Sequence, residues 1–578
     1  MAINFTATPF SLDSEAIRWV EDTLRDMSTE EKVGQLFCVL FRFAEVDEFH
    51  QVFSVLKPGG CMYRCVPLEK AVSFSNLLNR EADIPMLIAA NLEKGGNGII
   101  EEGTQVGSPM QIAATGDAGM SEKLGIVCAA EGKAAGANWA FTPIIDIDTN
   151  FRNPITNTRT FGSNPELVKD MGVSYVKAIQ RRGMAATVKH FPGDGQDERD
   201  QHLVTSINDM DCETWDNTYG QVYQACIDAG VMACMTGHIM LPEYSRRLNP
   251  GIRDEDIMPA SLDAGLLSGL LRGQLGFNGL IVTDATTMAG FTLPMSRKKA
   301  VPFSIACGCD MFLFSRNLEE DVNFMFEGVK SGIITEERLD EAVMRILATK
   351  AALELHTQRQ RGKTGRQSQQ AYIDIGYAKS TVGKSEHKSW AMECADKSIT
   401  LVKEQQGVLP ITPEKYRRIL FHTIEAVGGV SLYTVVEACS AVMQKLRDEG
   451  FIVDLFEPSA GMEGEGNLPK TVETTKVYDL ILYVANLATK SNQTVVRIEW
   501  AQPMGANCGH YINDVPTIFI SLENPYHLLD FPRVKTMINC YSSSDVTINA
   551  LIDKLCGRSA FKGESPVDPF CGKWDARL

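Results

Sequence analysis

Short apolar runs alternate with amphipathic stretches through the first two-thirds of the chain. Each run is four to seven residues long and gives way to turn residues or a polar segment, the pattern of a buried parallel strand followed by a helix. Eight runs spread over about 280 residues, close to the ~250 of a (β/α)8 barrel, predict such a barrel over residues 1–355. The predicted strands are Val33–Val39, Gly60–Tyr63, Pro85–Ala90, Ala140–Ile145, Ala185–Val188, Val231–Met235, Gly279–Thr283 and Asp310–Phe314.

Helix signals frame this region at both ends. The pattern predicts a helix over Ser14–Met27, and Ser28-Thr29-Glu30-Glu31 has the form of a capping box that begins the next helix. After the eighth strand, Thr335–Lys350 predicts a helix that closes the barrel. Its apolar face is formed by Leu339, Val343, Ile346 and Leu347.

A change of composition then predicts a second domain. Residues 356–390 begin with a basic, polar stretch and contain few large apolar residues, which is typical of a linker. Over 391–578 the alternating pattern returns with a helix predicted at Ser431–Glu449, so we expect an open, mostly parallel sheet in an α/β sandwich. The predicted strands are Ile399–Lys403, Ile419–His422, Phe451–Phe456, Leu480–Val484, Thr517–Leu522 and Thr536–Cys540.

Composition excludes several classes of partner. Hydrophobic residues make up 44% and charged residues 22% of the chain, as in soluble globular proteins. The net charge of −17 argues against a nucleic acid or an anionic membrane as partner. No stretch approaches the roughly 20 apolar residues that span a bilayer, and Met1-Ala2-Ile3-Asn4-Phe5 does not resemble the start of a signal peptide.

The cysteines predict a reducing compartment and no metal centre. Fifteen cysteines are scattered along the chain, several of them in apolar runs, and Cys307-Gly308-Cys309 has no second pair at zinc-ligand spacing. We interpret them as buried thiols of a cytoplasmic protein. No metal and no organic cofactor are expected, and the oligomeric state stays open, with a homodimer among the alternatives.

The segment from Lys189 to His202 concentrates the chemistry. It follows a predicted strand, at the position where barrel enzymes carry their active-site residues. Asp200 and His202 are two residues apart, so the carboxylate can hold one ring nitrogen while the other moves a proton. An isolated Asp-x-His pair is also compatible with an ordinary solvated loop.

The whole segment is less generic than the pair. Lys189-His190-Phe191-Pro192-Gly193-Asp194-Gly195, followed by Asp200-Gln201-His202, resembles the signature of family 3 glycoside hydrolases of the β-N-acetylglucosaminidase type. Three further stretches resemble landmarks of the same family and extend the likeness over most of the chain. They are Glu31–Leu36, Leu339–Leu347 and Ile399–Lys403 with Leu409-Pro410.

The resemblance implies a retaining mechanism with two catalytic groups. Asp200 and His202 would form the general acid/base dyad, and Asp284, at the end of a predicted strand, would be the nucleophile. From the strand alone, Asp284 could equally cap a helix. The family often has a second aspartate after the nucleophile, but this chain has Ala285, so one candidate remains. The family's usual His or Asn at position 194 is Asp194 here.

Other polar residues at predicted strand ends are candidates for binding the sugar. Lys189 and His190 follow the fifth strand, and Asp146 and Asp148 follow the fourth, where they could bind hydroxyls or cap a helix. His238 follows the sixth strand and could also be structural.

Two candidates for sugar binding come from the resemblance. Arg159 lies in an Arg-Thr-Phe-Gly segment similar to one whose arginine contacts sugar in the family, although a surface arginine is the alternative. Asn91 stands where the family commonly has an aspartate that binds sugar hydroxyls, and an amide cannot supply that charge-assisted bond. The identity of the sugar is therefore left open.

These observations predict a retaining exo-acting β-N-acetylhexosaminidase that releases terminal β-linked N-acetylglucosamine from a small or oligosaccharide glycoside. Within the same family, a phosphorylase and a β-glucosidase whose proton donor lies in the second domain are alternatives. A different class, a barrel that binds sugar or a protein without turnover, is a further alternative, against which the intact Asp284 and dyad argue.

Overall fold

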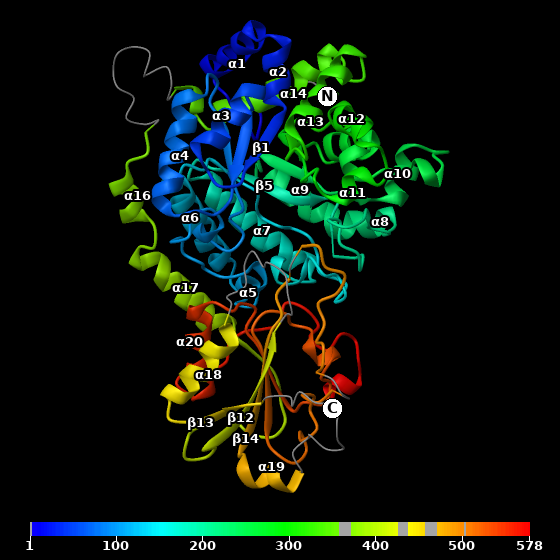
Figure 1. The fold of residues 1–578 in the computed structure, drawn as a ribbon. Coiled ribbons are helices and arrows are strands. Elements are labelled where there is room, and N and C mark those ends of the chain that lie inside the picture. Colours follow the sequence, from blue (N-terminus) through cyan, green and yellow to red (C-terminus); the bar gives the residue numbers. More distant parts are fainter. Residues whose placement is uncertain (1–2, 358–371, 426–436, 457–470, 490, 502–504) are drawn as a thin grey trace. The chain divides into compact units, whose positions relative to one another are not determined.

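The computed structural model describes residues 3–357, 372–425, 437–456, 471–489, 491–501 and 505–578. The chain forms two compact units (Figure 1). Unit 1 contains residues 1–106, 121–147 and 165–388, and unit 2 contains residues 107–120, 148–164 and 389–578. Two segments from the range predicted as barrel, 107–120 and 148–164, thus group with unit 2.

Unit 1 is the predicted (β/α)8 barrel. Its eight parallel strands follow the order β10-β1-β2-β3-β4-β5-β7-β9, and a parallel bridge between Val282 and Met311 brings the two outer strands of this order together. All the paired strands run in the same direction, so their carboxyl ends meet at one end of the barrel. The strands are β1 (Phe37–Phe41), β2 (Gly60–Tyr63), β3 (Leu87–Ala90), β4 (Trp139–Ala140), β5 (Ala185–Phe191), β7 (Ala233–Thr236), β9 (Leu280–Thr283) and β10 (Phe312–Leu313).

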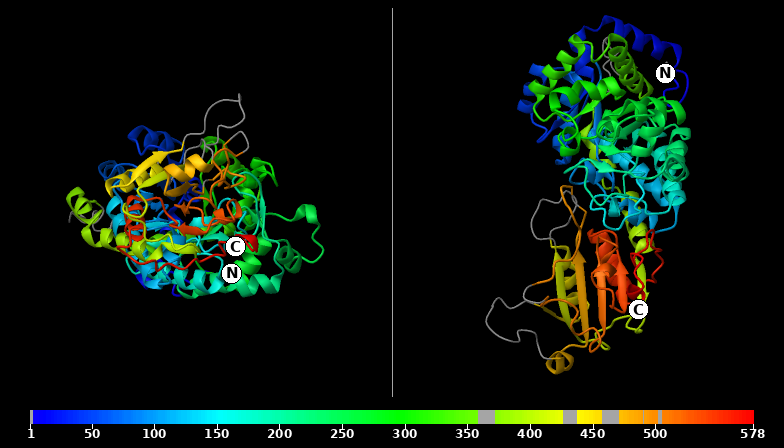
Figure 2. Two further views of the ribbon diagram at one scale, coloured as in Figure 1. Left: turned by 90° about the horizontal axis from the view of Figure 1, so that it is seen from below. Right: turned by 90° about the vertical axis from the view of Figure 1, so that its right-hand side faces the viewer.

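Helices cover the barrel strands on the outside, as Figures 1 and 2 show. The first two helices confirm the sequence prediction, and Ser28 and Glu31 form the expected capping box at the start of α2. The helices with residues in unit 1 are α1 (Ser14–Asp26), α2 (Thr29–Gln35), α3 (Val46–Val55), α4 (Leu68–Glu81), α6 (Ala118–Ala135), α7 (Pro165–Gln180), α8 (Cys212–Trp215), α9 (Gln221–Asp228), α10 (Pro242–Leu248), α11 (Ala289–Thr292), α12 (Arg297–Cys307), α13 (Leu318–Lys330), α14 (Glu336–Ala352), α16 (Ile375–Thr381) and α17 (Ser385–Ser398).

Most predicted barrel strands differ from the observed ones at their ends, and the first and the fourth differ most. The first begins at Phe37 instead of Val33, because the capping box starts a helix that continues to Gln35. The fourth pairs only over Trp139–Ala140 instead of extending to Ile145, since Pro143 has no N–H to donate to a neighbouring strand. Ile144 nevertheless makes one parallel bridge, to Lys189 of β5.

The predicted linker includes regular structure. Within the predicted linker, residues 375–381 form α16, and residues 385–390 belong to the first part of α17. Residues 358–371 lie outside the described part of the chain. Nδ1 of His387, at the start of α17, donates to Oε1 of Glu131 on α6 (2.6 Å), and both side chains are fully buried. This pair ties the start of α17 to the barrel.

Unit 2 contains the predicted open α/β sheet. Its strand order is β11-β16-β15-β14-β12-β13, and all neighbours are parallel except β11 and β16. Helix α18 begins at Ala438, and residues 431–436 of the longer predicted helix lie outside the described residues. The elements are β11 (Thr400–Glu404), β12 (Arg418–Glu425), β13 (Ile452–Leu455), β14 (Leu480–Asn486), β15 (Thr517–Ser521), β16 (Thr536–Asn539), α5 (Pro109–Ala113), α18 (Ala438–Asp448), α19 (Thr471–Val477) and α20 (Asp545–Leu555).

Separate apolar clusters pack against the two faces of this sheet. Helices α18 and α20 cover one face (Figure 1), with Val442 and Leu551 packed against residues such as Ile520. The other face carries a second cluster that includes Tyr483, Phe519 and residues after β14. All fifteen cysteines are free thiols, and no helix among the described residues has the length and apolar character needed to cross a membrane.

Candidate active site

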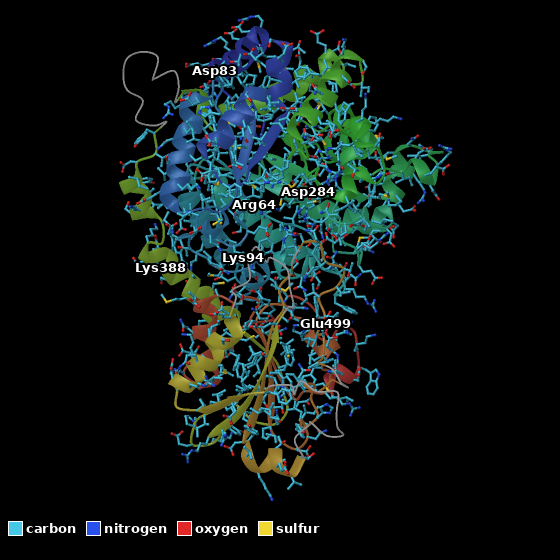
Figure 3. All side chains as sticks on the ribbon, viewed as in Figure 1. Arg64, Asp83, Lys94, Asp284, Lys388 and Glu499 are labelled. Atoms are coloured by element: carbon cyan, nitrogen blue, oxygen red, sulfur yellow. The ribbon has the colours of Figure 1, made fainter. Side chains whose placement is uncertain are left out.

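Asp284 follows β9 directly, at the carboxyl end of the barrel strands (Figure 3). Its backbone N–H donates to the carbonyl of Thr236 on β7 (2.9 Å), and its Oδ1 accepts from the N–H of Ala285 (2.7 Å). The side chain is 9% exposed, and Oδ2 has no hydrogen-bond partner within the described part of the chain. One carboxylate oxygen is thus held in place, while the other is buried and has no hydrogen-bond partner among the described residues.

His202 and Asp200 form the predicted dyad. Oδ1 of Asp200 accepts from Nδ1 of His202 (2.6 Å) and from its backbone N–H (2.9 Å). Asp200 is fully buried, whereas the imidazole is 21% exposed. Because Nδ1 carries the proton shared with Asp200, Nε2 is the nitrogen left to exchange a proton with a substrate.

The loop that carries the dyad is fastened to the neighbouring strand ends. The carbonyl of His202 accepts from the N–H of Ala289 (3.0 Å), the first residue of α11. Oε1 of Gln201 accepts from the backbone N–H of His238 (2.8 Å) after β7. These bonds join the dyad to the strand ends that also position Asp284.

His190 lies next to the nucleophile candidate. Its Nε2 is 3.9 Å from Oδ2 of Asp284, and its Nδ1 is 2.7 Å from Oδ2 of Asp146. The other oxygen of Asp146 accepts from the N–H groups of His190 and Asp194. Asp146 is 1% exposed, and its hydrogen bonds fix both the loop and the imidazole of His190. The other ring nitrogen of His190 faces Oδ2 of Asp284.

Lys189 pairs with a residue that the sequence did not single out. Its Nζ lies 3.1 Å from Oε1 of Glu93, and both side chains are buried. A buried lysine needs such a partner to stay charged. The pair connects β5 with the loop after β3.

His238 is fully buried and uses both ring nitrogens within the protein. Nε2 lies 3.1 Å from the carbonyl oxygen of Ala285, and Nδ1 lies 2.9 Å from Oγ of Ser261. A carbonyl only accepts, so Nε2 carries the proton, and Nδ1 accepts from the serine hydroxyl. Burial lowers the pKa of this imidazole despite the negative charge of Asp284 nearby, so His238 is neutral and positions the chain around the nucleophile candidate.

The remaining sugar-binding candidates divide between the two units. Asn91 follows β3 in unit 1, is half-buried, and its side chain makes no hydrogen bond among the described residues. Arg159 ends the short 3-10 helix η2 (Asn157–Arg159) and belongs to unit 2, so it is not among the residues that unit 1 gathers around Asp284. Asp148 also belongs to unit 2, where it accepts from Thr156 and Tyr526.

The charges around Asp284 favour its ionised form. Burial acts to raise its pKa, but His190, His202 and the N–H of Ala285 act to lower it. The result is a pKa below the ordinary value, so Asp284 is an anion at neutral pH. An ionised carboxylate next to imidazoles suits a nucleophile paired with a proton donor.

Comparisons with known proteins agree with this arrangement. The profile of the glycosyl hydrolase family 3 N terminal domain matches residues 28–349. A beta-N-acetylglucosaminidase/beta-glucosidase from Cellulomonas fimi is 49% identical over 577 residues, which cover 100% of both chains. Beta-hexosaminidase A from Pseudoalteromonas piscicida is 28% identical over 362 residues, covering 59% of this chain and 58% of that protein.

Solved structures resemble the whole chain. The beta-glucoside phosphorylase BglX has a TM-score of 0.91 and 44% identity over 99% of both chains. A family 3 beta-N-acetylglucosaminidase from Paenibacillus sp. str. FPU-7 has a TM-score of 0.76 and 25% identity over 95% of this chain and 100% of that one. With the barrel and its profile match, these similarities show that the chain belongs to glycosyl hydrolase family 3.

Proposed function

We propose that this family 3 glycosidase is a retaining, exo-acting β-N-acetylglucosaminidase/β-glucosidase that uses Asp284 as its nucleophile and His202 as its acid/base. The observation that carries the proposal is the state of two groups at one end of the barrel. Asp284 has one carboxylate oxygen without a protein partner among the described residues, and His202 has one ring nitrogen left over by Asp200. Both are held by backbone hydrogen bonds, which suits catalytic groups.

The first step forms a covalent glycosyl-enzyme. Oδ2 of Asp284 attacks the anomeric carbon, the bond from that carbon to the leaving oxygen breaks, and Nε2 of His202 donates its proton to the leaving oxygen. Asp200 stabilises the imidazolium before the transfer and holds the ring orientation. Nδ1 of His190 donates to Asp146, so Nε2 of the neutral ring is an acceptor, placed to receive a hydrogen bond from a sugar hydroxyl beside Asp284.

The second step returns the sugar to an acceptor. With water, Nε2 of His202 takes a proton as the water oxygen bonds to the anomeric carbon and the ester to Asp284 breaks. The product keeps the β configuration because two displacements occur at the same carbon.

Inorganic phosphate is a second candidate acceptor, favoured by two observations. A likeness of 44% identity over 99% of the chain is to a protein called a beta-glucoside phosphorylase. The acid/base is an imidazole, which is neutral after donating its proton and does not repel an approaching anion as a carboxylate would. Phosphate dianion would displace Asp284 without a base and give a β-glycosyl phosphate monoanion and the free carboxylate, so charge balances.

Asn91 bears on the choice of sugar. An uncharged amide stands after β3 in place of the expected carboxylate. An amide binds sugar hydroxyls less strongly than a carboxylate, so this position is compatible with more than one sugar. We therefore include both β-N-acetylglucosaminides and β-glucosides among the proposed substrates, as the double name of the Cellulomonas fimi relative also suggests.

One product analysis tests the proposal. Aryl β-glycosides of N-acetylglucosamine, N-acetylgalactosamine, glucose and xylose are incubated in buffers with and without phosphate, and products are followed by NMR. We expect β-anomeric products from the N-acetylglucosaminide or the glucoside. An α-anomeric first product would contradict retention, and release of glycosyl phosphate instead of free sugar would identify phosphate as the acceptor.

A further inference from the structure

Two arginines follow neighbouring strands at the same end of the barrel as Asp284. Arg42 comes directly after β1 and Arg64 directly after β2. The last residues of these strands, Phe41 and Tyr63, are partners in the parallel register, and the N–H of Arg64 donates to the carbonyl of Phe41 (3.3 Å). The backbones of the two arginines are therefore about one strand spacing, ~4.8 Å, apart.

The residues before the arginines fix the direction of both side chains. The rings of Phe41 and Tyr63 contact Phe74 of α4, with centroids 5.0 and 5.7 Å away. Helix α4 belongs to the outer layer, so both aromatic rings point away from the barrel axis. Side chains alternate along a strand. Arg42 and Arg64 are the first residues after their strands, and continued alternation would direct their side chains from the opposite face, toward the barrel mouth.

Neither guanidinium is neutralised by the protein. Both side chains are exposed, and within the described residues neither makes a side-chain hydrogen bond or ion pair. The acids that follow Arg42 most closely along the chain are Glu45, which pairs with Lys70, and Asp47. The two oxygens of Glu48 accept from the backbone N–H groups of Arg42, Phe43 and Glu45. Two exposed guanidinium groups that have no partner among the described residues thus extend from adjacent backbone positions, in a chain of net charge −17.

Other arginines of unit 1 show the contrast. Arg272 and Arg338 both pair with the buried Asp310, and Arg297 pairs with the buried Asp321. These structural arginines have their charge matched at short distance. Adjacent unmatched arginines repel one another, and a bound anion removes this repulsion.

A third arginine borders the pair on the side of the nucleophile candidate. Arg316 follows β10 by three residues, and its side chain is exposed. Among the described residues, only its backbone N–H makes a hydrogen bond, to Asp321 (3.1 Å). In the strand order, β10 lies between β1 and β9. The residues met in sequence around the barrel mouth are therefore Asp284, Arg316, Arg42 and Arg64.

We propose that Arg42 and Arg64 form a binding subsite for a phosphate dianion, with Arg316 at its edge. The planar guanidinium group matches phosphate oxygens with two parallel hydrogen bonds, and two such groups one strand apart can hold one dianion between them. Arg42 and Arg64 follow strands at the same end of the barrel as Asp284, so an anion held there would share the barrel mouth with the reacting glycoside. Only this catalytic consequence rests on the proposed function; the anion site itself does not.

The phosphoryl group has two sources. Inorganic phosphate at this subsite would be the acceptor that displaces Asp284 from the glycosyl-enzyme. A phosphoryl group on the substrate would instead anchor a phosphorylated glycoside. Binding of phosphate alone tests the shared chemistry, and kinetics with the two ligands separates the sources.

The test is a calorimetric titration of the free protein with inorganic phosphate at constant ionic strength, with chloride as the balancing anion. We expect saturable binding that Arg42→Gln and Arg64→Gln each weaken at least tenfold and that the double variant abolishes. Arg18→Gln is the matched control, because Arg18 of α1 is also exposed and unpaired among the described residues. It should bind phosphate as the wild type does, and all variants should keep the wild-type Tm, since the side chains are exposed.

Kinetics then assigns the source. If phosphate stimulates turnover of neutral aryl glycosides and the double variant loses at least tenfold of that stimulation, the subsite serves the acceptor. If instead the double variant selectively loses kcat/KM for a 6-phosphoglycoside, it serves the substrate. Both outcomes support the subsite even where the assignment of Asp284 and His202 fails, because binding is measured without turnover. No saturable phosphate binding, or binding unchanged in the double variant, overturns the proposal.

Discussion

Replacing His202 with alanine removes the proposed proton donor and little else. The imidazole is 21% exposed and contributes little to the barrel core. Asp200 keeps its bond to the backbone N–H of residue 202, so the cost to stability is the loss of one charge-assisted hydrogen bond, about 1.5–3 kcal/mol. The variant should therefore fold, and its kinetic defect should report on chemistry.

The size of that defect depends on the leaving group. Loss of a general acid slows a reaction by about 10²–10⁴-fold, equivalent to roughly 2.7–5.4 kcal/mol in the barrier at 1.36 kcal/mol per tenfold. This loss applies to alkyl and sugar leaving groups, whose oxygen must be protonated. A dinitrophenolate leaves without a proton, so we expect its first step to slow by less than about fivefold.

The assay is a series of aryl β-glycosides with leaving-group pKa values from about 4 to 10. A plot of log kcat/KM against this pKa should be much steeper for His202→Ala than for the wild type. Azide should raise kcat of the variant on activated substrates, because the anion attacks the glycosyl-enzyme without a base. His50→Ala is the control, since His50 is an exposed histidine on α3, and it should reproduce the wild-type slope.

Equal losses on activated and unactivated substrates would refute this reasoning. They would show that His202 supports binding or folding and does not transfer the proton. A loss confined to poor leaving groups without azide rescue would separate the first step from the second and leave the acceptor activation to another group.

Two further predictions concern the second unit and the base of the barrel. Glu404→Gln and Glu523→Gln should each keep activity within about tenfold, ~1.4 kcal/mol, because Glu404 accepts from Gln406 and Gly407 and Glu523 from Ser543. A loss of about 10²–10⁴-fold with azide rescue would instead make that acid the proton donor and favour the β-glucosidase alternative. Three further acids should be tested in the same way, although they lie outside the described residues: Glu457, Glu463 and Glu465. Burial lowers the pKa of Lys350 to about 7 in the folded protein. Between about pH 7 and pH 10.4, the unfolded chain therefore binds more protons at this lysine than the folded chain does. The stability of the wild type relative to Lys350→Met should therefore rise by up to about 4 kcal/mol between pH 7 and 10, at 1.36 per unit, in urea unfolding; a difference that does not change with pH would contradict the lowered pKa.

The sequence pattern was sufficient for the fold because each strand is a continuous apolar run bounded by breakers. Both the barrel and the mostly parallel second sheet are confirmed. Boundaries shifted where a local signal competed with apolarity, as at Val33, where the capping box extends α2. The apolar pattern of the fourth strand continues to Ile145, but the strand ends earlier, because Pro143 cannot donate a hydrogen bond to a neighbouring strand.

The polar contacts behind the site could not be read from the chain. Gln201 lies between the two members of the dyad in sequence, and its side chain accepts from the backbone N–H of His238 after β7, a contact that the sequence does not reveal. Glu93 gave no signal as the partner of Lys189, because the two are 96 residues apart and meet only when β3 and β5 enter the same barrel. Arg42 and Arg64 became a pair only through the register of β1 and β2.

The apolar pattern of the sequence also does not predict which distant segments belong to the same unit. Residues 148–164 follow the fourth barrel strand, but Asn157 bonds Asn524 and Gly162 packs against Pro566, all within unit 2. Such contacts depend on shape and on side-chain pairs far apart in sequence, which periodicity does not encode.

Covalent trapping of the nucleophile tests the central claim most directly. The protein is incubated with a 2-deoxy-2-fluoro β-glycosyl fluoride, whose fluorine slows release of the glycosyl-enzyme, and is then digested with pepsin and sequenced by mass spectrometry. Asp284 is expected to carry a single label in the wild type and in Gln201→Glu, whereas Asp284→Ala should fold with the wild-type Tm and remain unlabelled. A label on any other carboxylate, or a label that persists in Asp284→Ala, would contradict the assignment of Asp284 and with it the proposed mechanism.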